Sequence, residues 1–345
     1  MIIVADRSIP FIEGVFEPYG EVRYLDGHSI GRKDIADADA LLIRTRTKCN
    51  AGLLEGSPVR IIATTSIGTD HIDQAYCRKK GIYITNASGC NAGGVMNYVL
   101  SALYGTAARK SISLEGATLG IIGVGNSGKK IEHAARLLGF KLLLCDPPRA
   151  EKEGESQFCS LQTLLENSDI VTMHVPLTES TRKMADAAFF SKMKPGAFFI
   201  NSSRGEIVDE DDLEEALPKL GPVVIDTWNN EPDINIRLMN KIDIATPHIA
   251  GYSQYGKQTG AAYAVRSIAR YFNIQPLLDY FPKTENDELE VVKLDIQGKS
   301  QGQIASIIQY NYPIFTDDFM FRMNPSGFKE MRSIYKYRKE FFIDF

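Results

Sequence analysis

The sequence has no excess of basic charge. It holds 39 Lys and Arg residues against 43 Asp and Glu residues, which gives a formal net charge of -4. Binding to nucleic acid or to an anionic membrane requires a basic face that this balance does not supply. We therefore expect no nucleic-acid partner. With 44% hydrophobic and 24% charged residues, the composition is that of a soluble globular protein.

Long apolar runs are also missing. No uninterrupted apolar stretch approaches the roughly 20 residues that a membrane span requires. The apolar start, residues 1–5, is too short for a signal peptide, and no basic residues precede it. The sequence therefore predicts no membrane partner and a cytoplasmic location.

Cysteines are few, and no two of them have C-x-x-C spacing. The five are Cys49, Cys77, Cys90, Cys145 and Cys159. An odd number without metal-ligand spacing favours reduced, mostly buried thiols over a metal site or disulfides. We expect no bound metal.

Short apolar runs alternate with helical patterns along most of the 345 residues. This alternation predicts an α/β fold with parallel sheets built from βαβ units, in two or three domains. Strands are expected at residues 2–5, 40–43, 61–64, 82–85, 118–124, 141–145, 170–174, 197–201, 223–226 and 242–245. Helices are expected at residues 70–80, 92–109 and 253–272, and another follows the glycine-rich turn and runs to residue 138.

The character of the sequence changes after Pro282. Residues 283–288 are polar and charged, and they are interpreted as a linker. A strand is expected at residues 289–296 and a helix at residues 300–310. A segment this short buries little core of its own, so we expect it to pack on another subunit or on the main body.

A G-x-G-x-x-G motif, Gly123 to Gly128, directly follows a predicted strand and opens a predicted helix. In this context it is typical of a dinucleotide-binding turn, with the pyrophosphate at the helix N-terminus. The next strand ends at Asp146, whose carboxylate would bind the ribose hydroxyls and repel a 2′-phosphate. NAD is therefore favoured over NADP, although Arg149 nearby weakens that preference. The alternative is a glycine turn without a cofactor.

Three polar clusters follow later predicted strands, at residues 201–206, 226–232 and 246–252. They contain Arg204, Glu231 and His248. Ligands of open α/β sheets bind beyond the carboxyl ends of the strands, so the three loops are expected to converge there. Each residue taken alone is more often a surface residue or a member of an ion pair. The combination with a cofactor motif favours catalysis.

With these motifs the sequence resembles the D-isomer-specific 2-hydroxyacid dehydrogenase family over nearly all of residues 1–282. The resemblance implies two Rossmann-like doubly wound lobes around a cleft. Residues 1–93 and 251–282 would form the substrate lobe, and residues 94–250 the NAD-binding lobe. Residues 283–345 would form a small C-terminal dimerisation domain in a homodimer.

The resemblance also implies roles for the three clustered residues. His248 would take the proton of the substrate C2 hydroxyl while hydride leaves C2 for the nicotinamide. Glu231 would orient the imidazole, and Arg204 would hold the substrate carboxylate with its planar fork. Contacts with NAD are implied at Gly123, Gly125, Asn126, Ser127, Gly128, Asp146, Val175, Ser203, Asp226 and Gly251. Val175 departs from the family, where a hydroxyl residue is frequent.

A second basic cluster bears on the substrate. Arg44, Arg46 and Lys48 end a predicted strand together with Thr45, and such a set suits a phosphate group. The alternative is a solvated basic loop. Within the family, the resemblance is greatest to a branch that oxidises a small phosphorylated hydroxy acid. It implies substrate contacts at Arg44, Thr45, Arg46, Ser66 and Tyr252.

Two other functions stay open from the sequence. One is oxidation of D-3-phosphoglycerate or another D-2-hydroxy acid. The other is an NAD-sensing binding protein without catalysis, which the presence of Arg204, Glu231 and His248 disfavours. A basic cluster near the C-terminus, comprising Arg332, Lys336, Arg338 and Lys339, would contact a phosphate in a partner subunit or form an exposed basic helix.

Overall fold

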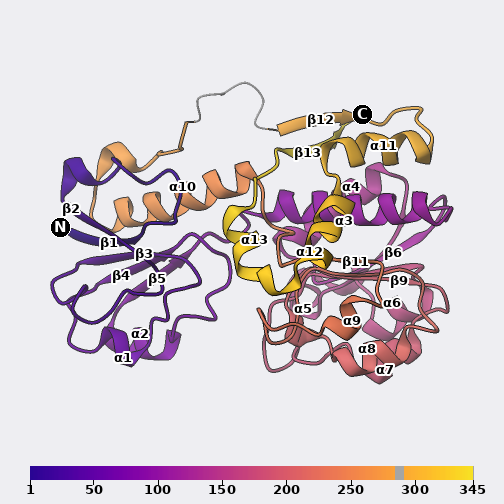
Figure 1. Ribbon diagram of the computed structural model, residues 1–345, viewed down its shortest axis with the longest axis horizontal. Helices are drawn as coiled ribbons and strands as arrows, with labels where there is room; N and C mark the ends of the chain where they lie inside the picture. The colour runs from indigo at the N-terminus through magenta and orange to yellow at the C-terminus, as the bar shows by residue number, and fades with distance from the viewer. Residues whose placement is uncertain (284–290, 345) are drawn as a thin grey trace. The chain divides into compact units, whose positions relative to one another are not determined.

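The computed structural model describes residues 1–283 and 291–344. The chain divides into two compact units (Figure 1). The first comprises Met1–Asn91 and Gln254–Glu290, and the second comprises Ala92–Ser253 and Val291–Phe345.

The first unit is built on a five-stranded parallel sheet with the order β2-β1-β3-β4-β5. Its strands are β1 (Ile2–Asp6), β2 (Glu21–Leu25), β3 (Ala40–Ile43), β4 (Ile61–Thr64) and β5 (Tyr83–Asn86). Every residue of β3 and β4 is buried, as expected for central strands covered on both faces. The helices are α1 (Ala51–Leu54), α2 (Gln74–Lys80) and α10 (Gln254–Tyr271), and α10 packs against β4 and β5.

The second unit contains a six-stranded parallel sheet with the order β11-β10-β9-β8-β6-β7. Its strands are β6 (Thr118–Ile122), β7 (Lys141–Cys145), β8 (Ile170–Met173), β9 (Phe198–Asn201), β10 (Val223–Ile225) and β11 (Ile244–Ala245). Because β7 and β8 lie on opposite sides of β6, the strand order reverses there. Such a switch point is where nucleotides bind in open sheets.

Helices surround this second sheet. They are α3 (Ala92–Arg109), α4 (Asn126–Leu137), α5 (Pro147–Glu153), α6 (Leu161–Asn167), α7 (Ala187–Lys192), α8 (Glu210–Ala216) and α9 (Ile236–Met239). Most of α3 is buried, so it is a core helix rather than an amphipathic cover. Short 3-10 helices occur at η1 (Glu17–Tyr19), η2 (Glu155–Gln157), η3 (Gly205–Ile207), η4 (Gln275–Leu277) and η5 (Pro325–Gly327).

The C-terminal segment packs on α3 of the same chain (Figure 1). It consists of β12 (Val291–Asp295), α11 (Gln301–Asn311), α12 (Ile314–Met323), α13 (Phe328–Ile334) and β13 (Glu340–Asp344). Strands β12 and β13 form a parallel pair. Ile308 and Phe341 enter the same hydrophobic cluster as Val99 and Leu103 of α3. The dimerisation role of residues 283–345 stays a prediction.

The predicted α/β class is confirmed, and so is the alternation of strands and helices. The helix predicted at residues 70–80 begins later, at Gln74, because Asp73 caps it by accepting a hydrogen bond from the Tyr76 N–H. Strand β2 was not predicted. It lies at the sheet edge, where Glu21 is exposed, so it lacks a continuous apolar run. Most of the linker predicted at 283–288, and the start of the strand predicted at 289–296, lie outside the described residues.

All five cysteines are free thiols, and four of them are buried. Within the described residues, no helix combines the length and apolar character that a membrane crossing demands.

Candidate active site

The glycine motif forms the turn between β6 and α4. Gly123 has φ +85°, and a Cβ there would lie 2.7 Å from the backbone carbonyl group of His174. A Cβ on Gly128 would collide with the Gly123 carbonyl oxygen. A Cβ on Gly125, the residue that caps α4, would meet no atom within 4 Å. Two glycines are therefore needed for packing, and the third leaves open space at the N-terminus of a helix, where a pyrophosphate fits.

Asp146 follows β7 and lies beside this turn. Its carboxylate accepts hydrogen bonds from the Val124 N–H at 2.7 Å and the Arg149 N–H at 3.1 Å. The Arg149 guanidinium is paired with Glu153 and also donates to the Val124 carbonyl oxygen. Because these contacts occupy its guanidinium, Arg149 is not available to bind a 2′-phosphate. The reason for which the sequence weakened the preference for NAD is thereby removed. Open space at Gly125 and a carboxylate at Asp146 together fit a dinucleotide.

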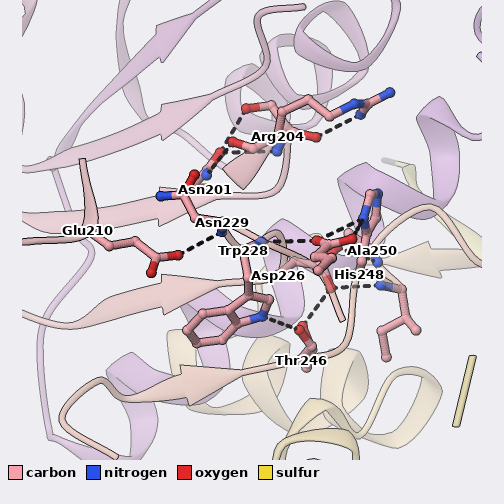
Figure 2. Close-up of polar contacts among 12 residues, drawn as sticks. Asn201, Arg204, Glu210, Asp226, Trp228, Asn229, Thr246, His248 and Ala250 are labelled. Atoms are coloured by element: carbon pink, nitrogen blue, oxygen red, sulfur yellow. Dashed lines mark hydrogen bonds and ion pairs between the residues drawn. The ribbon is translucent and has the colours of Figure 1, made fainter. Parts of the chain in front are cut away.

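His248 and Glu231 form a hydrogen-bonded ion pair (Figure 2). The His248 Nδ1 lies 2.8 Å from Glu231 Oε2 and 3.1 Å from Oε1. Glu231 also accepts the Trp228 N–H at 3.0 Å. Burial raises the pKa of Glu231, but the charge and hydrogen bond of His248 and the Trp228 N–H outweigh burial, so the net pKa is lowered. Glu231 is thus ionised at neutral pH.

An ionised carboxylate only accepts hydrogen bonds, which fixes the state of the imidazole. The Nδ1 of His248 must carry a proton to bond Glu231. In the neutral ring, Nε2 then holds the lone pair. This is the arrangement of a general base whose partner orients the ring and stabilises the imidazolium.

The backbone at His248 is left-handed, with φ +56°. Such a conformation costs roughly 1–3 kcal/mol in a residue other than glycine and needs support from its surroundings. Asp226, which is 1% exposed, supplies it. Its carbonyl oxygen accepts the His248 N–H at 2.7 Å, and its carboxylate accepts the N–H groups of Ile249 and Ala250 at 2.8 and 2.9 Å. The predicted contact of Asp226 with the cofactor stays a prediction.

Arg204 follows β9, next to β10 in the sheet. Asn201 shapes this loop, because its side chain donates to the Arg204 carbonyl oxygen and accepts from the backbone and hydroxyl of Ser203. The predicted catalytic residues therefore follow three neighbouring strands, β9, β10 and β11. Figure 2 shows Arg204 and His248 among the polar contacts of these loops. The sequence reasoning missed the supporting role of Trp228, although it is the sequence's single tryptophan.

The other predicted cofactor residues occupy the same unit. Asn126 and Ser127 begin α4, and Ser203 is buried after β9. Val175 follows β8, and its side chain lies close to Gly123. Gly251 follows the His248 loop. These positions lie beyond the carboxyl ends of the strands, and their contacts with NAD stay predictions.

The predicted substrate residues divide between the units. Arg44, Thr45 and Arg46 follow β3, and Ser66 follows β4, its neighbour in the first sheet. Arg44 Nη1 donates to the Ser8 hydroxyl at 3.2 Å. Tyr252 belongs to the second unit. Its ring makes edge contacts with Tyr335 and Tyr337, and the Arg332 guanidinium lies 5.6 Å from its centre.

Comparison with known proteins gives one consistent result. Residues 97–250 match the family model described as D-isomer specific 2-hydroxyacid dehydrogenase, NAD binding domain. An erythronate-4-phosphate dehydrogenase of Bacteroides fragilis is 40% identical over 99% of this chain and 97% of its own length. One of Escherichia coli is 37% identical over 99% of this chain and 92% of its own.

Solved structures show the same fold. D-lactate dehydrogenase of Aquifex aeolicus, complexed with NAD and lactic acid, has a TM-score of 0.65 at 23% identity, over 81% of this chain and 98% of that one. NAD-bound 3-phosphoglycerate dehydrogenase of Entamoeba histolytica has a TM-score of 0.67 at 25% identity, over 79% and 96%.

Replacing Gly125 by alanine separates cofactor binding from folding. The added methyl group would meet no protein atom, so stability to urea should hardly change. It would occupy the space predicted for the pyrophosphate, so we expect NAD affinity to fall roughly tenfold or more. The matched control is Gly128→Ala, whose methyl group strikes the Gly123 carbonyl and should cost roughly 1–3 kcal/mol of stability. Wild-type NAD affinity in Gly125→Ala would contradict the placement.

Proposed function

Since the chain belongs to the D-isomer specific 2-hydroxyacid dehydrogenase family, we propose that it oxidises 4-phospho-D-erythronate at C2 to 2-oxo-3-hydroxy-4-phosphobutanoate. The protein is an NAD-dependent oxidoreductase. The full-length similarity to erythronate-4-phosphate dehydrogenases at 37–40% identity carries the proposal. The reaction is a step in the biosynthesis of pyridoxal phosphate, vitamin B6. D-3-phosphoglycerate and other D-2-hydroxy acids are the alternative substrates.

The pair of His248 and Glu231 supports the chemistry. In our proposal the His248 Nε2 takes the proton of the C2 hydroxyl, and Glu231, 2.8 Å from Nδ1, stabilises the imidazolium that forms. Arg204 holds the substrate carboxylate and polarises the C2 oxygen. When bound, NAD accepts the hydride that leaves C2. The alternative of a noncatalytic NAD sensor gives no reason for an ionised Glu231 that fixes the imidazole.

For the phosphate group we propose Arg44, Thr45, Arg46 and Ser66, and for a further substrate contact Tyr252. Arg44 is supported by the Ser8 hydroxyl and carbonyl oxygen. Ser8 in turn donates to the buried Asp6 carboxylate at 2.6 Å. An arginine held in this way loses less side-chain entropy when its planar fork binds a phosphate.

We further propose that the protein is a homodimer that assembles through the C-terminal segment. Helix α12 buries one face and exposes the other, on which Phe319, Met320 and Met323 are 60%, 54% and 69% exposed. Apolar side chains at this spacing form one stripe along a helix. Contiguous exposed apolar surface is typical of a protein–protein contact.

We place the enzyme in the cytoplasm. Its five cysteines are free thiols, which suits a reducing compartment. This location is a proposal that rests on thiol chemistry.

A substrate panel tests the function. The purified protein, with NAD, is offered 4-phospho-D-erythronate, D-3-phosphoglycerate, D-lactate and unphosphorylated D-erythronate, and NADH absorbance is followed. We expect kcat/KM to be greatest for 4-phospho-D-erythronate, as the similarity to erythronate-4-phosphate dehydrogenases implies. The two unphosphorylated acids should be poor substrates, because they lack the phosphate that arginine can bind. Faster turnover of D-3-phosphoglycerate would overturn the substrate assignment but not the enzyme class.

Replacing His248 by asparagine should abolish turnover and leave NAD binding intact. Loss of a general base typically costs roughly 10²–10⁴-fold in rate. Glu231→Gln keeps the side-chain shape but removes the charge that stabilises the imidazolium, so kcat should fall by a smaller but still large factor, roughly 10²-fold. NAD affinity is measured by fluorescence titration. Turnover that persists in His248→Asn would show that another group is the base.

The dimer is tested with Phe319→Glu combined with Met323→Glu. Two charges on the exposed face of α12 should prevent apolar contact and yield a monomer in light scattering during gel filtration. The matched control is Ile236→Glu on α9, which is an exposed apolar residue outside the C-terminal segment and should not change the mass. If the double variant is still a dimer, the interface lies elsewhere in the protein.

A further inference from the structure

The strand that leads to His248 is short and lies at an edge. Strand β11, Ile244–Ala245, pairs on one side only, with β10. Edge strands leave backbone groups without a ladder partner. The exposed edge is occupied by α12, whose Asp318 carboxylate accepts the Ala245 N–H at 2.7 Å. Asp318 thus takes the place of a strand partner for Ala245, which precedes His248 by three residues.

Asp318 is itself fixed in place. It is buried, and its Oδ1 also accepts Arg322 Nε at 2.8 Å. The other guanidinium nitrogens of Arg322 donate to the carbonyl oxygens of Met239 and Ile242. These two carbonyls lie at the end of α9 and just before β11. The ion pair of Asp318 and Arg322 therefore binds the residues just before β11 and also Ala245, the last residue of β11.

A second contact reaches the next residue, Thr246. Its hydroxyl donates to the Asp226 carboxylate at 2.6 Å. Because Thr246 has a single hydroxyl proton, the Tyr98 hydroxyl 2.7 Å away must donate to it. Tyr98 is fully buried on α3, and its ring packs edge-on against Tyr312, two residues before α12. The C-terminal segment thus supports Thr246 through Tyr98.

We propose that α12 positions the catalytic histidine loop of its own chain, with Asp318 as the positioning residue. The inference rests on the proposed role of His248. Only Thr246 and Pro247 separate Ala245 from His248, whose backbone is left-handed. A displacement of Ala245 would therefore also displace His248. Glu231 is carried by the loop after β10. A shift of β11 against β10 would therefore move the imidazole relative to its carboxylate and to the substrate.

The test compares Asp318→Ala, Asp318→Asn and Asp169→Ala in the full-length enzyme. Asp318→Ala leaves the Ala245 N–H without a partner. The amide oxygen of Asp318→Asn can still accept from both Ala245 and Arg322, so it is the rescue variant. Asp169 is the matched control, because its carboxylate accepts the N–H of Thr118, the first residue of β6, at 2.9 Å. This contact joins β8 to β6 and does not involve β11.

The decisive measurement is the primary isotope effect with substrate deuterated at C2. Misplacement of the base slows the chemical step, so Asp318→Ala should lower kcat roughly tenfold or more and increase the isotope effect, with unchanged NAD affinity. For Asp318→Asn, kcat and the isotope effect should both stay within about twofold of the wild-type values. Asp169→Ala should lose thermal stability without a change in the isotope effect. The isotope effect does not depend on the fraction of folded enzyme, so a merely structural loss would leave it unchanged.

A wild-type isotope effect in Asp318→Ala would overturn the proposal, as would an equal increase in Asp169→Ala. If Asp318→Ala fails to fold, Tyr98→Phe replaces it, because it removes the donor to Thr246 and keeps the ring. Hydrogen exchange of residues 245–250 gives a readout without activity. We expect faster exchange in Asp318→Ala, and unchanged exchange would overturn the proposal. An inactive wild type with this exchange pattern would instead contradict the proposed function.

Discussion

The buried carboxylate of Asp226 is the interaction on which the candidate active site depends. It accepts the hydroxyl of Thr246 and the N–H groups of Ile249 and Ala250, so it closes the loop around His248. Burial raises the pKa of Asp226, even though the charge of His248 and these donors oppose the increase. A charge inside a protein is costly unless hydrogen bonds compensate for it. The loop supplies that compensation, so the charge and the strained histidine backbone stabilise each other.

The C-terminal segment contributes to the packing around the same site. Its strands and helices share a hydrophobic cluster with α3 and with the nucleotide-binding sheet, and α12 occupies the edge of β11. A segment of about 50 residues could hardly form a stable core alone. Packing on α3 solves that problem and at the same time covers an exposed strand edge. The face of α12 that remains outside is the one we assign to subunit contact.

Much of this could be predicted from the sequence, for identifiable reasons. Buried parallel strands such as β3 and β4 are continuous apolar runs, and the Gly123 turn has a fixed spacing. The convergence of the loops that carry Glu231 and His248 was predicted from their places after neighbouring strands, and the pairing of the two side chains was implied by the family resemblance. Strand β2 could not be predicted, because an edge strand need not be apolar. The contacts of Asp318 and Tyr98 were also out of reach, since they join residues 73 and 148 positions apart and no local pattern marks them.

Asp146 supports the local fold in addition to its predicted role at the ribose, and this combination bears on the evolution of cofactor preference. A change of cofactor preference is usually pictured as the removal of one repulsive acid beside the ribose. Asp146, the acid predicted to lie there, also accepts the Val124 N–H of the glycine turn and caps α5 through the Arg149 N–H. The Arg149 side chain is paired with Glu153. A lineage drifting toward the phosphorylated dinucleotide would have to rebuild the turn, the cap and the ion pair together. If Asp146 sets the preference for NAD, as the sequence predicts, that preference rests on the local fold as well as on charge.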